Sequence, residues 1–154
     1  MRFLELRIPP PLVGLTIAGA MWFVAWSLPP LLPLPAPVRL PTAIILALAG
    51  VAIALSGVIS FRRAQTTVNP LKPETSTSLV STGIYRFTRN PMYLGMLAVL
   101  VAWAAYLPSA WALLGPVAFA FYIARFQIIP EERALRSLFG AAFVEYTHNV
   151  RRWL

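Results

Sequence analysis

The feature that most constrains this chain is a succession of long apolar runs in which charged residues are absent. Residues 92–124 contain no Lys, Arg, Asp, Glu or His, and neither do residues 41–60. A helix of about 20 apolar residues spans the hydrocarbon core of a bilayer. Hydrophobic residues make up 58% of the chain and charged residues only 12%, which is too apolar for a soluble domain of this length. The sequence therefore predicts an all-α, polytopic integral membrane protein.

We expect a single integral membrane domain over residues 1–154, with about four transmembrane helices and an amphipathic helix at its C-terminal end. The expected spans are residues 11–28, 41–60, 91–107 and 109–129. The Pro-rich residues 29–41 predict a stiff loop, because proline lacks an N–H and clashes with the preceding helical turn. Residues 131–150 carry apolar side chains at three-and-four spacing, which is typical of a helix lying in the membrane interface.

Basic residues gather on one side of these expected spans. Only Arg39 falls on the other side, apart from Arg125 within the fourth span. The cytoplasmic leaflet attracts Lys and Arg, so we expect the termini, the polar segment 61–90 and the active site to face the cytoplasm, with the cell inner membrane as the location. The net charge of +8 is then explained by contact with membrane lipids rather than with nucleic acid. The first apolar run lacks a small-residue cleavage site and is expected to be a retained helix rather than a signal peptide.

The residue inventory excludes several kinds of chemistry. The chain has no Cys and a single His, and its acidic residues are five Glu. Zinc sites, other metal sites, thiol nucleophiles and Ser-His-Asp triads are therefore not supported. His148 is expected to be solvated or lipid-facing rather than a catalytic base. Arg125, near the end of the fourth span, either extends to the interface or reaches a bound substrate.

Two polar clusters stand at the cytoplasmic ends of spans. The first is LVSTGIYRFTRNPMYLG, residues 79–95, and the second is Glu131-Glu132, directly after Pro130. Alone, the first could anchor a helix at the membrane interface, and the second could cap a helix N-terminus. Together they supply guanidinium and amide donors, carboxylates and aromatic faces at one membrane level. Such a pocket suits S-adenosylmethionine, which carries a carboxylate, an amino group, ribose hydroxyls, adenine and a sulfonium.

Three segments carry a resemblance to a known superfamily. They are RNPMYLG at residues 89–95, PEE at residues 130–132, and FGAAFVEYTHNVRRW from Phe139. The chain resembles the isoprenylcysteine carboxyl methyltransferase and phospholipid methyltransferase superfamily from about residue 61 onward. The resemblance implies a helical membrane methyltransferase that uses S-adenosylmethionine. Family members often have His where this chain has Asn90, which can still form a hydrogen bond.

The resemblance also implies which residues form the site. The expected cofactor contacts are Leu79, Val80, Gly83, Tyr85, Arg89, Asn90, Tyr93, Leu94, Gly95, Glu131 and Glu132. Arg89, Glu131 and Arg125 are the candidate catalytic residues. The acceptor is expected to be a lipophilic small molecule or a lipid-anchored group that enters from the bilayer. No obligate protein partner is inferred.

Two other functions remain open at this point. A membrane reductase using NADPH is one, because sterol reductases resemble this superfamily in their C-terminal helices. A non-enzymatic scaffold or transporter subunit is the other, although the uncharged residues 92–124 offer no path for an ion or proton. Binding of NADPH would indicate the reductase. Ligand binding that does not change when Arg89 and the Glu pair are substituted would indicate the scaffold or transporter subunit.

Overall fold

The computed structural model describes residues 4–32, 35–65, 71 and 73–154, which form helices and contain no β-strand. The α-helices are α1 (Pro10–Ser27), α2 (Ala36–Arg63), α3 (Pro91–Tyr106), α4 (Leu114–Ile123) and α5 (Ile129–Asn149). Three 3-10 turns (Pro73–Thr75, Gly83–Arg86 and Ala110–Leu113) and a π-helical turn, Ala124–Ile128, complete the described structure. The all-α prediction is confirmed.

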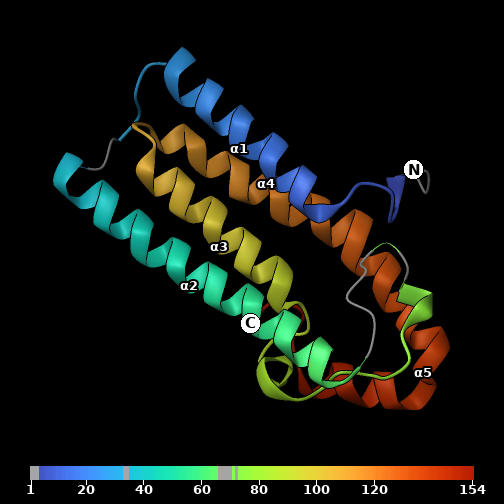
Figure 1. Cartoon of the computed structure of the whole chain (residues 1–154). Helices are drawn as coiled ribbons and strands as arrows, with labels where there is room; N and C mark the ends of the chain where they lie inside the picture. Colours follow the sequence, from blue (N-terminus) through green and yellow to red (C-terminus); the bar gives the residue numbers. More distant parts are fainter. Residues whose placement is uncertain (1–3, 33–34, 66–70, 72) are drawn as a thin grey trace.

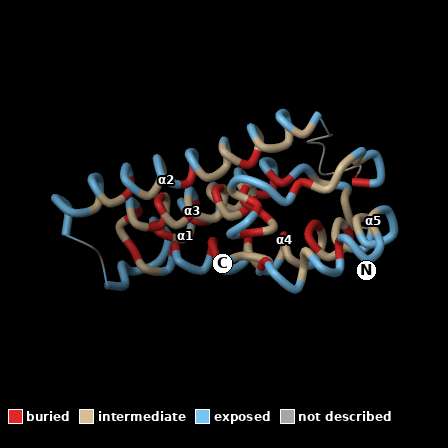
Figure 2. Tube along the Cα trace, turned by 90° about the horizontal axis from the view of Figure 1, so that it is seen from below, coloured by how far each residue is buried: buried red, intermediate tan, exposed pale blue. Residues whose placement is uncertain are grey.

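The first four α-helices lie alongside one another, and α5 turns away at one end (Figure 1). Helix α2 packs on α3, while α1, α3 and α4 contact one another. Figure 2 shows buried positions along the inside of this bundle and exposed positions on its outer sides. Phe119 and Ile123 of α4 are completely buried in the core, together with residues of α1 and α3.

The outer faces of the bundle are apolar, as expected for a protein whose solvent is lipid. Among the described residues, three helical stretches are long and apolar enough to cross a membrane: Pro10–Ser27, Ala36–Arg63 and Ala110–Asn149. Helix α3 is a shorter apolar helix of 16 residues. Large apolar side chains such as Phe23 (65% exposed) and Ile45 (67% exposed) point outward. The chain is therefore an integral membrane protein.

Two glycines allow α2 and α3 to approach closely. A Cβ added to Gly50 would lie 2.7 Å from the carbonyl oxygen of Gly95. A Cβ added to Gly95 would lie even closer to the carbonyl oxygen of Gly50, and would also lie 2.8 Å from the amide nitrogen of Ala54. Small residues at such a contact let helix backbones pack together in lipid, where no hydrophobic effect drives helices together.

Helix α2 begins at Ala36, earlier than the residue 41 expected from the sequence. The amides of Val38 and Arg39 already donate to the carbonyl of Pro35, at 2.9 and 3.2 Å. Proline is tolerated in the first turn of a helix, where its missing N–H has no partner to lose. The helix therefore starts among the prolines, with Pro37 in its first turn, and the connecting loop is shorter than residues 29–41. Pro41 lies inside the helix, beyond this first turn.

The sequence predicts that the fourth span ends at residue 129, just before Pro130. The structure has no helix end there. Helix α4, the π-helical turn and α5 follow one another without a break, and Pro130 lies inside the first turn of α5. Because Pro130 has no N–H, it cannot donate to the carbonyl of Phe126 four residues earlier. That carbonyl accepts instead from the amide of Leu6, at 3.0 Å. The N-terminal segment thus satisfies the group that the proline leaves free.

The helix expected over residues 131–150 is broken at Gly140 rather than continuous. Gly140 has φ 50° and ψ −122°, which a residue with a side chain rarely adopts. The chain turns there, so that the second half of α5 returns toward the start of α3 (Figure 1). Beyond Asn149, the chain leaves the helix at Val150, which is buried in an extended conformation.

Candidate active site

A cavity lies where α3 begins, between the end of α2, the segment before α3, and α5. Its walls thus come from parts of the chain that are far apart in the sequence. The lining residues are Phe61, Pro73, Ser76, Ser78, Leu79, Val80, Tyr85, Arg89, Asn90, Met92, Tyr93, Ile128, Glu131, Glu132, Leu135, Phe143 and Tyr146.

One wall of the cavity holds a carboxylate between two guanidinium groups. Arg89 Nη2 lies 3.3 Å from Glu132 Oε1. Arg152 binds the same carboxylate through both oxygens, with Nε at 3.0 Å from Oε1 and Nη2 at 2.7 Å from Oε2. This hydrogen bond raises the pKa of Arg152. Arg89 Nε is buried and has no hydrogen-bond partner among the described residues, so it can still donate to a ligand.

The neighbouring carboxylate has a different environment. Glu131 follows the apolar part of the long helical stretch Ala110–Asn149, at the point where charged residues become frequent. Tyr93 donates its hydroxyl to Glu131 Oε2 at 3.2 Å. Burial raises the pKa of Glu131 to about 7, against the opposing effect of the Tyr93 hydrogen bond. Two adjacent carboxylates therefore differ in kind: Glu132 is ion-paired, and Glu131 changes protonation near neutral pH.

Aromatic rings form much of the remaining wall. Phe61, from the end of α2, meets the Tyr85 ring edge-on with centroids 5.3 Å apart. Tyr146 of α5 donates its hydroxyl to the carbonyl of Tyr85 at 2.8 Å. Burial raises the pKa values of both tyrosines well above their usual value, so the phenols remain neutral. Aromatic faces of this kind can stack on adenine and attract a cation.

The residues just before α3 form hydrogen bonds with the carbonyls of residues 151 and 152. The amide of Arg89 donates to the carbonyl of Arg151 at 3.0 Å, and Asn90 Nδ2 donates to the carbonyl of Arg152 at 2.9 Å. Thr88, which is completely buried, donates its hydroxyl to the same Arg152 carbonyl at 3.4 Å. The arginine and the asparagine of the RNPMYLG segment are thus fixed by backbone groups about 60 residues later.

The structure brings together eight of the site residues expected from the sequence. Those in the cavity wall are Leu79, Val80, Tyr85, Arg89, Asn90, Tyr93, Glu131 and Glu132. Gly83, Leu94, Gly95 and Arg125 are outside the lining that the described residues form. Their roles toward a cofactor or acceptor stay predictions.

The residues outside the lining have structural environments of their own. Gly83 has φ +63°, and so permits the turn that carries Tyr85 into the wall. Gly95 packs against α2, and Leu94 follows the cavity residue Tyr93 in the first turn of α3. Arg125 donates to Glu5 Oε1 at 2.7 Å, which lowers the pKa of Glu5, and Arg133 pairs with the other oxygen of that carboxylate.

Several lining residues were not among the expected contacts. Leu135 and Phe143 belong to the apolar side of the C-terminal helix, whose spacing predicts a helix at the membrane interface. Phe61 lies at the end of α2, and Met92 lies within the RNPMYLG segment at the start of α3, although the resemblance implies no contact at either. From the sequence, Tyr146 and Arg152 fit either the pocket or the membrane interface, and the interface is the favoured interpretation because nothing in their spacing indicates contacts with Tyr85 and Glu132.

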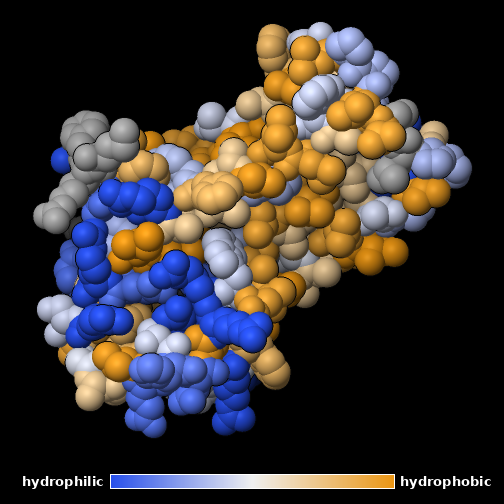
Figure 3. Space-filling model, turned by 180° about the vertical axis from the view of Figure 1, so that it is seen from behind, coloured by the Kyte–Doolittle hydropathy of each residue, from blue (hydrophilic) through white to orange (hydrophobic). Residues whose placement is uncertain are grey.

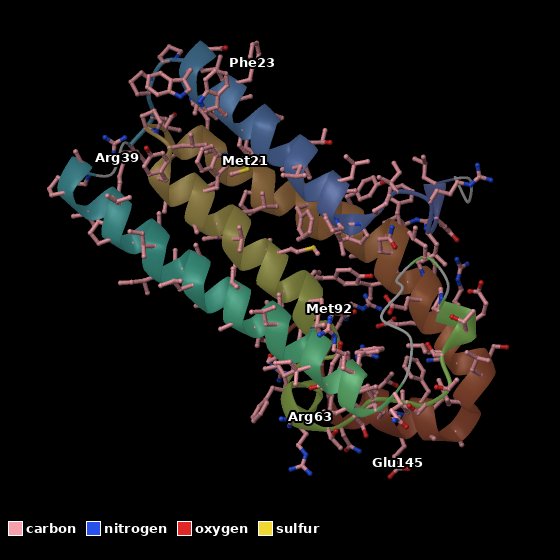
Figure 4. The ribbon with its side chains drawn as sticks, viewed as in Figure 1. Met21, Phe23, Arg39, Arg63, Met92 and Glu145 are labelled. Atoms are coloured by element: carbon pink, nitrogen blue, oxygen red, sulfur yellow. The ribbon has the colours of Figure 1, made fainter. Side chains whose placement is uncertain are left out.

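Charge is concentrated at the cavity end of the molecule. Figure 3 shows hydrophilic residues gathered at one end and hydrophobic residues over the rest of the visible face. In Figure 4, Arg39 lies at the far end of α2 from Arg63, and Glu145 points away from the bundle near α5. Met92 lies at the start of α3. The polar site therefore lies at one membrane level, next to the apolar bundle.

The comparisons with known proteins agree with this geometry. The sequence matches the phospholipid methyltransferase family over residues 38–142, about two-thirds of the chain. The chain belongs to the phospholipid methyltransferase family. It is therefore a membrane methyltransferase, and the resemblance to this superfamily seen in the sequence is confirmed. The family match includes both polar clusters and ends before Phe143, Tyr146 and Arg152.

Further similarity is limited. An uncharacterized protein of Haemophilus influenzae is 44% identical over 63 residues, which are 41% of this chain and the whole of that protein. No solved structure matches the chain.

Proposed function

We propose that this chain transfers the methyl group of S-adenosylmethionine to a lipophilic acceptor at the cytoplasmic face of the membrane, in the manner of isoprenylcysteine carboxyl methyltransferases. One observation carries the proposal. The buried, unpartnered Nε of Arg89 belongs to a cavity wall that also contains Glu131 and Glu132. An orphaned donor beside carboxylates and aromatic rings suits a ligand with a carboxylate, an amino group and a planar ring.

The lining residues fit the parts of this cofactor. Arg89 would hold its carboxylate, because a guanidinium binds carboxylates with directed hydrogen bonds. Glu131 or Glu132 would accept from its amino group or ribose hydroxyls. Phe61, Tyr85 and Phe143 offer ring faces for adenine. NADPH would instead need several cations for its phosphates, whereas Arg89 is the single arginine that the described residues contribute to the lining.

The chemistry requires little covalent participation by the protein. When bound, the cofactor would supply a methyl group on a positively charged sulfur, and that sulfur would leave as a neutral thioether once the acceptor has bonded to the methyl carbon. Arg89 and the Glu pair orient the two reactants, and orientation alone can contribute a large part of a rate enhancement. Phe61, Phe143 and Tyr146 exclude water from the reacting atoms. Glu131, with a pKa of about 7, can take a proton from an acceptor that loses one.

The surroundings of the cavity favour an acceptor that arrives from the bilayer. Met92, Ile128 and Leu135 are apolar lining residues, and the first two belong to the apolar helices. Basic residues flank this end of the bundle, whereas Arg39 stands at the other end (Figure 4). We infer from this asymmetry that the site faces the cytoplasm, where the cofactor is available. Arg89 or Arg125 would orient the polar head of the acceptor.

Calorimetric titration of S-adenosylhomocysteine into the detergent-purified protein tests the proposal. We expect binding by the wild type, and affinity weakened by about tenfold or more in Glu132→Gln, because a charge-assisted hydrogen bond is lost. Glu145→Gln is the matched control, since Glu145 is an exposed carboxylate of the same helix. A folded wild type that binds NADPH but not S-adenosylhomocysteine would overturn the proposal in favour of a reductase, and binding of neither would favour a scaffold.

A further inference from the structure

The last residues of the chain form a strap across the entry to α3. We use the term C-terminal strap for residues 150–153. Val150 is buried, and Trp153 packs against the core of the bundle. Between them, the carbonyls of Arg151 and Arg152 accept the three hydrogen bonds from Thr88, Arg89 and Asn90 described above. The strap is therefore held at both of its ends and through its backbone.

The side chain of Arg152 connects this strap to the cavity wall. Its guanidinium binds both oxygens of Glu132, at 3.0 and 2.7 Å, whereas Arg89 approaches a single oxygen at 3.3 Å. In the described part of the chain, the cavity lining includes Glu132 and Arg89 but not Arg152. Arg152 therefore contacts a carboxylate of the lining without being a lining residue itself. Its direct contact is with the group that would meet a ligand.

We infer that Arg152 is a positioning residue for the cofactor site: through the C-terminal strap it sets the orientation of the Glu132 carboxylate and keeps Arg89 available to a ligand. This inference rests on the proposed function. A bidentate guanidinium fixes both the position and the plane of a carboxylate, which a single contact does not. Because Arg152 neutralises Glu132, Arg89 is not required for that purpose and can direct its free Nε to a ligand carboxylate.

The C-terminal strap also indicates a structural role for Asn90. Its side-chain amide donates to the carbonyl of Arg152, so that the backbone that carries the guanidinium is fixed from the α3 side. The amide of Arg89 does the same at Arg151. The backbones of Arg89 and Arg152 are therefore connected through the Arg151 carbonyl and the Asn90 side chain, and a displacement of the strap would move both arginines. Such coupling predicts that changes at Arg152 and Glu132 are not additive.

A double-mutant cycle on S-adenosylhomocysteine binding tests this inference in the full-length, detergent-purified protein. The variants are Arg152→Gln, Glu132→Gln and the double substitution. We expect Arg152→Gln to weaken binding about three- to tenfold in the wild-type background and to have almost no effect in the Glu132→Gln background. Arg152→Lys keeps the positive charge but not the planar guanidinium that binds both carboxylate oxygens, so it should recover only part of the affinity. Arg151→Gln is the matched control, since its side chain is exposed and the charge change is equal.

The outcomes separate this inference from the proposed function. If wild type binds S-adenosylhomocysteine and Arg152→Gln binds it equally well, Arg152 has no positioning role and the inference fails while the proposed function stands. Equal weakening by Arg152→Gln in both backgrounds would also overturn it, because Arg152 would then act without Glu132. If Arg152→Gln does not fold, the comparison of Arg152→Lys in the two backgrounds decides. Absence of binding by the folded wild type overturns both.

Discussion

Tyr93 and Glu131 are neighbours in the cavity wall, and the tyrosine hydroxyl donates to Glu131 Oε2 at 3.2 Å. The neighbouring Glu132 has two arginine partners, whereas no ion pair to Glu131 is present among the described residues. A carboxylate that is taken out of water without a cation favours its protonated form. The pair Glu131-Glu132, which the sequence presents as equivalent, is therefore divided by its surroundings into a fixed anion and a titrating group.

This difference predicts a pH-dependent stability. Burial raises the pKa of Glu131 from 4.5 to about 7, so its contribution to stability is complete below pH 4.5 and is lost as the pH rises through 7. The wild type should be destabilised by roughly 1 to 3 kcal/mol at pH 8.5 relative to pH 5, through this group alone. Glu131→Gln removes the titration. Its thermal midpoint in detergent should therefore decline less between these pH values than that of the wild type.

Glu145→Gln provides the control for loss of one carboxylate from α5. Glu145 is exposed and does not line the cavity. If Glu131→Gln and wild type show parallel pH profiles, Glu131 ionises without a penalty in the folded protein and cannot serve as a neutral-pH proton acceptor.

Gly140 is predicted to be essential to the return of α5. Its φ of 50° with ψ of −122° is strained for any residue with a Cβ, so Gly140→Ala should cost about 1 to 3 kcal/mol although nothing lies within 4 Å of the added methyl. Phe143 and Tyr146 follow this turn, so S-adenosylhomocysteine binding should weaken as well. Gly19→Ala is the control, since its position in α1 is equally open but helical. Equal thermal midpoints for the two variants would show that the turn is not required.

Gly50 and Gly95 are predicted to act together in packing α2 on α3. An added methyl at either position would collide with the facing backbone, and we expect each Ala variant to lose about 1 to 3 kcal/mol of stability. Gly14→Ala, where the nearest atom is 3.8 Å away, should be nearly neutral. The two variants also test the predicted cofactor contact at Gly95. If Gly95→Ala weakens S-adenosylhomocysteine binding and Gly50→Ala does not, Gly95 contacts the cofactor in addition to packing.

Much of the bundle follows from one-dimensional properties of the sequence. Apolar runs of bilayer length predicted the bounds of α1 and α3 to within a few residues, because the length of an apolar run is set by the membrane and not by distant contacts. The two polar clusters converge on one cavity for a similar reason. One cluster precedes α3 and the other lies in the first turn of α5, and the up-and-down course of successive spans brings these two places to the same end of the bundle.

The features that sequence reasoning missed depend on partners that are remote in the chain. Pro130 predicts the end of a helix, but the carbonyl that it leaves free is satisfied by Leu6, which no local pattern reveals. Gly140 is a weak signal within an otherwise regular amphipathic pattern, since glycine in a helix is tolerated at a cost of about 1 kcal/mol. Arg152 was grouped with a basic terminus, because its contact with Glu132 exists only after α5 has turned.

Two substitutions of Asn90 test whether the hydrogen bond that its side chain donates holds the C-terminal strap in place. Its side-chain amide donates to the carbonyl of Arg152 at 2.9 Å, and neutral His can also donate one N–H. Asn90→His should therefore keep the strap in place and retain S-adenosylhomocysteine binding within about threefold. Asn90→Leu leaves that carbonyl with only the longer hydrogen bond from Thr88 and should lose roughly 1 to 3 kcal/mol of stability. Thermal midpoints and calorimetric affinities of both variants check this. Equal losses in the two would mean that Asn90 acts through its shape or its carbonyl oxygen, and that the donated hydrogen bond is not what holds the strap.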